Sequence, residues 1–131
     1  MHIVPLYASI LALLFVALSV RTLRMRRRLK IAIGDAGNQA MLRAMRVHSN
    51  FAEYVPLSLL LIYFVEVSGA NSLLVHVLAL CLLAGRASHA FGVSQVKENY
   101  TFRAFGMVTT FATLIAASAY LVHSYASRVG T

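Results

Sequence analysis

The chain has 131 residues, which is the size of one domain, and 60% of them are hydrophobic while only 12% are charged. This composition, with a mean hydropathy of +0.74, excludes a water-soluble globular protein and predicts a single membrane-embedded domain, residues 1–131. The net charge of +8 does not indicate a nucleic-acid-binding protein, because eleven of the twelve Lys and Arg residues fall at or near two connections between apolar stretches.

Four apolar stretches follow one another along the chain. They cover residues 3–20, 51–67, 73–85 with a continuation towards 91, and 104–122. A helix needs about 20 mostly apolar residues to span a bilayer, and core helices of soluble proteins are usually shorter. The sequence therefore predicts an all-α fold, an integral membrane four-helix bundle.

The first stretch could be a secretory signal peptide instead of a retained helix. It has no basic residue before its apolar run and no small-residue cleavage pattern after it, and its basic cluster comes afterwards. We therefore expect a retained helix, which continues through residues 21–30 because that segment contains no helix breaker. A turn at "GDAGN", residues 34–38, supplies Asp35 or Asn38 as the cap of the next helix.

The other connections are short as well. The "SGANS" turn at residues 68–72 makes the second and third helices antiparallel neighbours, and residues 92–101 lead into the fourth helix. That helix carries Ala112, Ala116 and Ala119 at helical spacing. Small residues on one face allow close packing between helices in lipid, so we expect this face to contact another helix.

The basic residues indicate an orientation. They gather after the first and third helices, so the positive-inside rule places both basic connections in the cytoplasm and both termini outside. Contact with anionic membrane lipids accounts for much of this charge, and snorkelling towards the head groups is the favoured interpretation for Arg26, Arg27 and Arg28. No group of His, Cys, Asp or Glu has metal-ligand spacing, so we expect no metal site.

One face of the second helix is polar. Arg46, Asn50 and Glu53 are separated by steps of four and three, which stacks a cation, an amide and a carboxylate. Glu53 lies inside the apolar run, where an unpaired carboxylate is costly and marks a function or a specific partner. The alternative is structural: Arg46 and Glu53 neutralise each other or a neighbouring helix.

The other helices bring cations to the same membrane depth. Arg86 and His89 share a face at the end of the third helix, Arg103 begins the fourth, and Arg24 lies near the end of the first. Arginines that converge on a partly buried site bind planar carboxylates through paired, charge-assisted hydrogen bonds. The constellation therefore predicts a site for a small organic anion with two carboxylates.

These residues resemble a known family. "RVHSNFAEYVPL", residues 46–57, is similar to the second-helix signature of the membrane-associated proteins in eicosanoid and glutathione metabolism, the MAPEG family. "GRASH" resembles the family's third-helix motif, and "LRMRRR" the basic end of its first helix. The resemblance covers nearly the whole chain and is closest to a branch of small bacterial members. It implies a homotrimer in a bacterial inner membrane, with glutathione bound between neighbouring subunits near the cytoplasmic side.

The resemblance also implies roles on the second helix. Arg46 and Asn50 would hold carboxylate and backbone groups of glutathione, Glu53 would hold the γ-glutamyl amino group, and Tyr54 would support the peptide. The activity implied is that of a glutathione transferase or peroxidase acting on lipophilic electrophiles.

Residues of the other three helices complete the implied site. Arg86 and His89 would line the same pocket, Arg24 matches the first-helix arginine, and Arg103 matches the arginine that stabilises the thiolate. A nearby cation favours the thiolate, which is the nucleophilic form of a thiol.

The chain departs from the family pattern at two positions. Val93 stands where some catalytic members carry Tyr, and Ala104 stands where some carry Ser after the thiolate-stabilising arginine. A non-catalytic glutathione-binding or lipid-binding membrane protein is therefore an alternative. Another is a small multidrug exporter that uses Glu53 for proton exchange, although the surrounding arginines would repel cationic drugs.

Overall fold

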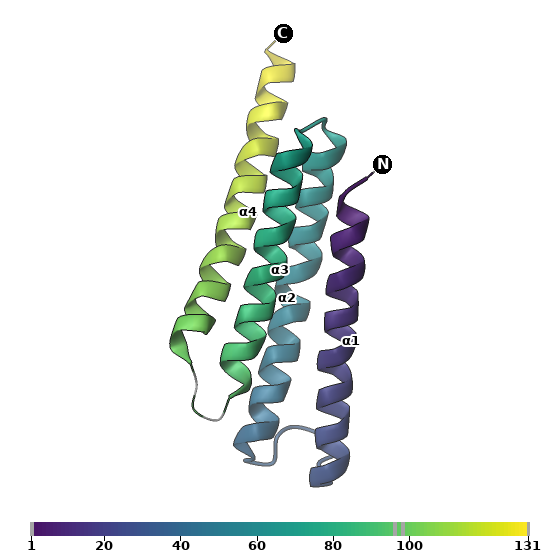
Figure 1. The fold of residues 1–131 in the computed structure, drawn as a ribbon, viewed down its shortest axis with the longest axis vertical. Helices are drawn as coiled ribbons and strands as arrows, with labels where there is room; N and C mark the ends of the chain where they lie inside the picture. The colour runs from purple at the N-terminus through teal and green to yellow at the C-terminus, as the bar shows by residue number, and fades with distance from the viewer. Residues whose placement is uncertain (1, 96, 98, 131) are drawn as a thin grey trace.

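The computed structural model describes residues 2–95, 97 and 99–130, and these residues form a bundle of long helices (Figure 1). The elements are α1 (Val4–Leu29), α2 (Gln39–Val67), α3 (Ser72–Ser94) and α4 (Tyr100–Val129). Each is long and apolar enough to cross a membrane. The expected all-α four-helix membrane fold is confirmed, and so is the continuation of the first helix through the basic segment.

Asparagine side chains begin three of the helices. The Oδ1 atom of Asn38 accepts a hydrogen bond from the backbone N–H of Met41 (3.0 Å) at the start of α2. Asn71 and Asn99 cap α3 and α4 in the same way, each accepting from backbone N–H groups two or three residues later. These caps satisfy donors that have no partner inside the helix. Asn50, the remaining asparagine of the chain, has a different partner.

The start of α1 is capped from a distance. Its N-cap residue, Ile3, provides no side-chain acceptor; instead the carboxylate of Glu66 on α2 accepts hydrogen bonds from the backbone N–H groups of Ile3 and Val4. The Nδ1 atom of His2 lies 3.7 Å from the same carboxylate. A negative charge at a helix N-terminus is favourable because it complements the helix dipole. Glu66 therefore fastens the beginning of α1 to the end of α2.

The helices run alternately up and down, with α1 and α4 on opposite sides of the bundle (Figure 1). Both described ends of the chain lie at one end of the bundle, and the connections after α1 and α3 lie at the other. Because those two connections carry most of the cations, we call their side the basic end.

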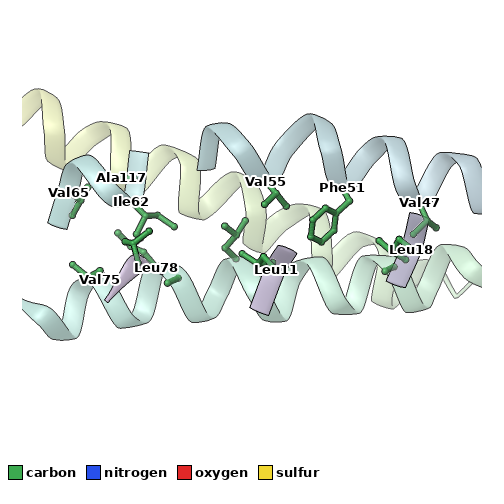
Figure 2. Packing of buried hydrophobic residues seen from close by; sticks show 14 of the residues in the cluster. Leu11, Leu18, Val47, Phe51, Val55, Ile62, Val65, Val75, Leu78 and Ala117 are labelled. Carbon is green, nitrogen blue, oxygen red and sulfur yellow. The ribbon is translucent and has the colours of Figure 1, made fainter. Parts of the chain in front are cut away.

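The apolar core lies mainly between α1, α2 and α3, and Ala117 of α4 joins it (Figure 2). Figure 2 shows Leu11 and Leu18 of α1 facing Phe51 and neighbouring residues of α2, with Leu78 of α3 further along the cluster. Many large apolar side chains point outward instead, including Leu13, Leu80, Val108 and Ile115. Outward apolar faces are expected where the solvent is lipid.

The helix α4 packs mainly along α3, but not through the expected alanines. Ala112, Ala116 and Ala119 are exposed, so they are not the face through which α4 packs inside this bundle, and their contact with a helix of another chain stays a prediction. The buried residues of α4 are Gly106, Thr110, Thr113 and Ala117. Helical spacing fits both the alanine face and the buried face of α4. The contact forms on the buried face, where Gly106 meets Gly85 of α3.

Candidate functional site

A polar cleft opens at the basic end, between α2, α3 and α4. It has a volume of about 450 Å³, which is within the range of small-molecule sites. Its lining residues are Gln39, Leu42, Arg43, Arg46, Ser49, Asn50 and Glu53 of α2, His89 and Val93 of α3, and Arg103 of α4. The structure thus brings five of the predicted site residues together: Arg46, Asn50, Glu53, His89 and Arg103.

The cleft has an excess of positive charge. Among the residues that the structure describes, three arginines line it, Arg43, Arg46 and Arg103, against the single carboxylate of Glu53. Arg46 and Glu53 are both exposed, and among the residues that the structure describes they form no ion pair with each other. The interpretation in which they neutralise each other is therefore not the arrangement found. Cations grouped on a partly enclosed surface raise the local concentration of anions.

Arg86 lies behind the cleft and is only 1% exposed. Its Nη1 donates a hydrogen bond to Oδ1 of Asn50 (2.7 Å), and its Nη2 donates to the backbone carbonyl of Gly106 (3.1 Å). The ring of Tyr54 covers the guanidinium, with 5.6 Å between its centroid and Cζ. Arg86 therefore reaches the cleft through Asn50, since its own side chain does not line it.

Glycines let α3 and α4 touch at this level. A Cβ on Gly106 would lie 2.5 Å from the carbonyl oxygen of Gly85 and 2.6 Å from Cβ of His89. A Cβ on Gly92 would lie 2.8 Å from the backbone nitrogen of Arg103. Real Cβ atoms cannot approach so closely, and only glycine permits this backbone contact. The contact places His89 and Arg103 on the same wall of the cleft.

Other arginines at the basic end hold backbone carbonyls at helix ends. Nη1 of Arg43 donates to the carbonyl of Val93 (3.4 Å), and Nη2 of Arg21 donates to that of Ser94 (3.4 Å), both at the end of α3. Cations suit helix C-termini because the dipole is negative there. Nη1 of Arg26 donates to the carbonyl of Gly34 (3.0 Å). Arg26 therefore braces the connection after α1, which the snorkelling interpretation did not foresee.

Two predicted site residues lie away from the cleft. Arg24 is exposed on α1 and lines a separate groove together with Arg21 and Arg28. Tyr54 packs against Phe111 of α4, with ring centroids 5.7 Å apart, and against the guanidinium of Arg86. Neither residue lines the cleft.

Sequence reasoning missed Gln39 and Ser49 of the lining. Gln39 lies seven residues before Arg46, so extending the stripe of positions 46, 50 and 53 backwards by two turns would have found it. Ser49 gives no such signal, because it lies beside the stripe. Its hydroxyl donates to the carbonyl of Arg46 (3.3 Å).

The two residues that depart from the family pattern, Val93 and Ala104, lie in different surroundings. Val93 lines the cleft and contributes an apolar side chain there, whereas Ala104 is exposed and does not line it. Neither supplies a hydroxyl to a ligand.

Comparisons with known proteins agree with these features. The model of the MAPEG family matches residues 4–123. The inner membrane protein YecN of Escherichia coli K12 is 36% identical over 110 residues, which cover 84% of this chain and 82% of YecN. YecN of Escherichia coli O6:H1 (strain CFT073) matches to the same extent. No solved structure matches the chain.

Proposed function

Because this chain belongs to the MAPEG family, we propose that it is a membrane-bound, glutathione-dependent transferase or peroxidase that acts on lipophilic electrophiles. The observation that carries the proposal is the cleft with three arginines and one carboxylate. Glutathione has two carboxylates and one ammonium group, so its charge pattern is the complement of this lining. Arginine forks suit carboxylates, and a lone glutamate suits an ammonium.

The proposal gives five side chains of the cleft a part. Arg46 binds a carboxylate of glutathione, Asn50 binds its peptide or carboxylate oxygens, and Glu53 binds the γ-glutamyl ammonium group. His89 contacts the tripeptide from α3. Arg103 faces the thiol and favours its ionised form, because a nearby cation lowers the free energy of the thiolate.

The chemistry is nucleophilic substitution or peroxide reduction. In the first, the thiolate sulfur attacks an electrophilic carbon, a carbon–sulfur bond forms, and the leaving group departs with its electron pair. In the second, two glutathione molecules reduce a hydroperoxide to an alcohol and water and become a disulfide. Both second substrates are apolar and reach the cleft from the bilayer.

We further propose that the protein is a homotrimer in an inner membrane, with the basic end in the cytoplasm. Support comes from the four apolar helices, from the inner membrane relative, and from the concentration of cations at one end. Arg24 is exposed and lines a groove separate from the cleft of its own protomer. A site shared between subunits would let Arg24 complete the cleft of a neighbour.

A second candidate is a glutathione-binding protein without catalysis. The observation that favours it is Val93, which offers a methyl group in the cleft where a hydroxyl would help to stabilise a thiolate. Turnover separates the two functions: a catalyst conjugates glutathione to a nitro-substituted aryl halide, and a binding protein does not.

Calorimetry on the purified protein in detergent tests the proposal. We expect saturable glutathione binding and a loss of about tenfold or more in affinity for Arg46→Gln, because a charge-assisted hydrogen bond is removed. Arg27→Gln is the matched control, since it removes the same charge from an exposed position outside the cleft. Equal affinities for the two variants would discard this cleft as the site.

A further inference from the structure

The guanidinium of Arg86 is a buried cation whose described contacts are with neutral groups. It is 1% exposed, and it donates to Asn50, to the carbonyl of Gly106 and to the sulfur of Met107 (3.6 Å). Among the residues that the structure describes, its Nε has no hydrogen-bond partner. A buried charge without a counter-ion is costly, and in a membrane span such a charge marks a function.

The contact between Arg86 and Asn50 fixes the direction of the asparagine amide. A guanidinium has donors and no acceptor, so the atom of Asn50 that faces it is the carbonyl oxygen Oδ1. The Nδ2 group points the other way. Because Asn50 lines the cleft, this group presents its two N–H donors to whatever binds there.

The same contact extends the electrostatic effect of Arg86 to the cleft. A cation that donates to Oδ1 polarises the amide, which strengthens the Nδ2–H groups as donors in a region of low dielectric. Arg43, Arg46 and Arg103 add positive charge around the same cleft, and Glu53 lies one turn further along α2. Asn50 therefore discriminates in favour of an acceptor, such as a carboxylate or peptide carbonyl, and against a donor.

We propose that Arg86 is a positioning residue for ligand recognition: held between Gly106 and Tyr54, it locks Asn50 with its donors towards the cleft and presents its own buried charge through that amide. The ligand group bound there is a carboxylate or peptide carbonyl oxygen of glutathione. This ligand assignment rests on the function proposed above, whereas the lock itself does not.

The variant Asn50→Asp separates a positioning role from a merely structural one. Asparagine and aspartate are nearly isosteric and have similar helix propensities, so the change is small for the fold. Opposite Arg86 it creates an ion pair, and we expect a higher unfolding temperature. Towards the cleft it replaces two donors by an anionic oxygen, and we expect glutathione affinity to fall at least tenfold.

Two comparisons make this experiment decisive. Ser49→Asp introduces the same charge one residue away, where Arg86 is not a partner, and it should not raise the unfolding temperature. In an Arg86→Met background, Asn50→Asp should lose its stabilising effect. Should Arg86→Met fail to fold, Arg86→Gln takes its place, since its neutral amide removes the cation and keeps a polar side chain that can donate a hydrogen bond.

Each outcome decides something different. If Asn50→Asp changes stability by the same amount with and without Arg86, the lock is overturned. If it leaves glutathione affinity within twofold of the wild type, Asn50 does not present donors to the ligand and the positioning role is overturned. A wild-type protein that binds no glutathione overturns the proposed function and the ligand assignment, while the stability comparison still decides the lock.

Discussion

Gly85 and Gly106 lie against each other where α3 meets α4, with the carbonyl oxygen of Gly85 only 2.5 Å from the place that a Cβ on Gly106 would occupy. This contact has two effects on the cleft. It brings the carbonyl of Gly106 within reach of Arg86, and Arg103, one turn before Gly106, lines the same cleft as His89. The geometry of the site therefore depends on the absence of two side chains.

The first prediction concerns this glycine contact. Gly106→Ala should destabilise the protein by about 1–3 kcal/mol, because the added methyl group forces the helices apart. Gly130→Ala is the matched control, since its Cβ would have ordinary contact, 3.5 Å from the carbonyl of Ala126. Thermal unfolding in detergent measures both variants. Equal stability of the two would show that α3 and α4 are less tightly packed than described.

The second prediction concerns the remote cap of α1. Glu66→Gln should destabilise the start of α1 by about 1–2 kcal/mol, because the carboxylate that accepts from Ile3 and Val4 loses its charge. Hydrogen exchange of the first-turn amides of α1 should become faster. Glu53→Gln, which touches no helix N-terminus, is the control and should leave this exchange unchanged. Unaltered exchange in Glu66→Gln would show that the Glu66 carboxylate does not stabilise the start of α1.

In the third prediction, Glu53→Gln is the test variant and Glu66→Gln is the control. Glu53→Gln should lower glutathione affinity by about tenfold, because the ammonium group of the ligand loses its charged partner, while Glu66→Gln should leave affinity unchanged. Calorimetry compares the two. The same variants address the exporter alternative: vesicles carrying the wild type should show no proton-coupled dye uptake. Uptake that is lost in Glu53→Gln would favour export over glutathione chemistry.

The fourth prediction concerns the missing hydroxyl. Val93→Tyr should increase the rate of aryl halide conjugation by about tenfold or more, because a hydroxyl donor in the cleft stabilises a developing anion. Val93→Phe is the control, since it adds the same ring without the hydroxyl. The expected difference lies in kcat, with little change in glutathione affinity. If the two variants conjugate at equal rates, a hydroxyl at this position does not limit catalysis.

The fifth prediction concerns the sharing of the site between subunits. Arg24→Gln and Arg46→Gln should each weaken glutathione binding as homo-oligomers. When they are coexpressed, some interfaces pair an intact Arg24 with an intact Arg46, and a fraction of high-affinity sites should return. Calorimetric titration of the mixed oligomer counts these sites. A mixture no better than either variant alone would place Arg24 outside the site.

Much of the fold was predictable because lipid imposes simple rules. Apolar length fixed the number of helices, and the absence of a breaker predicted the long α1, which ends at Leu29. The face through which α4 packs inside the bundle was not predicted, because spacing cannot tell which of two small-residue faces meets α3. The cap by Glu66 was not foreseen either, since it joins residues 63 positions apart.

The cleft was predictable where it lies on one helix. Positions 46, 50 and 53 share a face by helical geometry alone. The direction of the Arg86 side chain was not predictable, because that side chain turns inward only where Gly85 and Gly106 allow α4 to approach. The sequence motif therefore indicated that Arg86 matters for the site, whereas its contact with Asn50 required the packing of three helices.

A structure of the purified protein with saturating glutathione would reveal the bound tripeptide and its partners together. We expect one tripeptide in each cleft, with a carboxylate against Arg46, an acceptor oxygen at Nδ2 of Asn50, the ammonium group near Glu53 and the sulfur facing Arg103. An empty cleft at saturating ligand, or glutathione bound away from these side chains, would contradict this expectation.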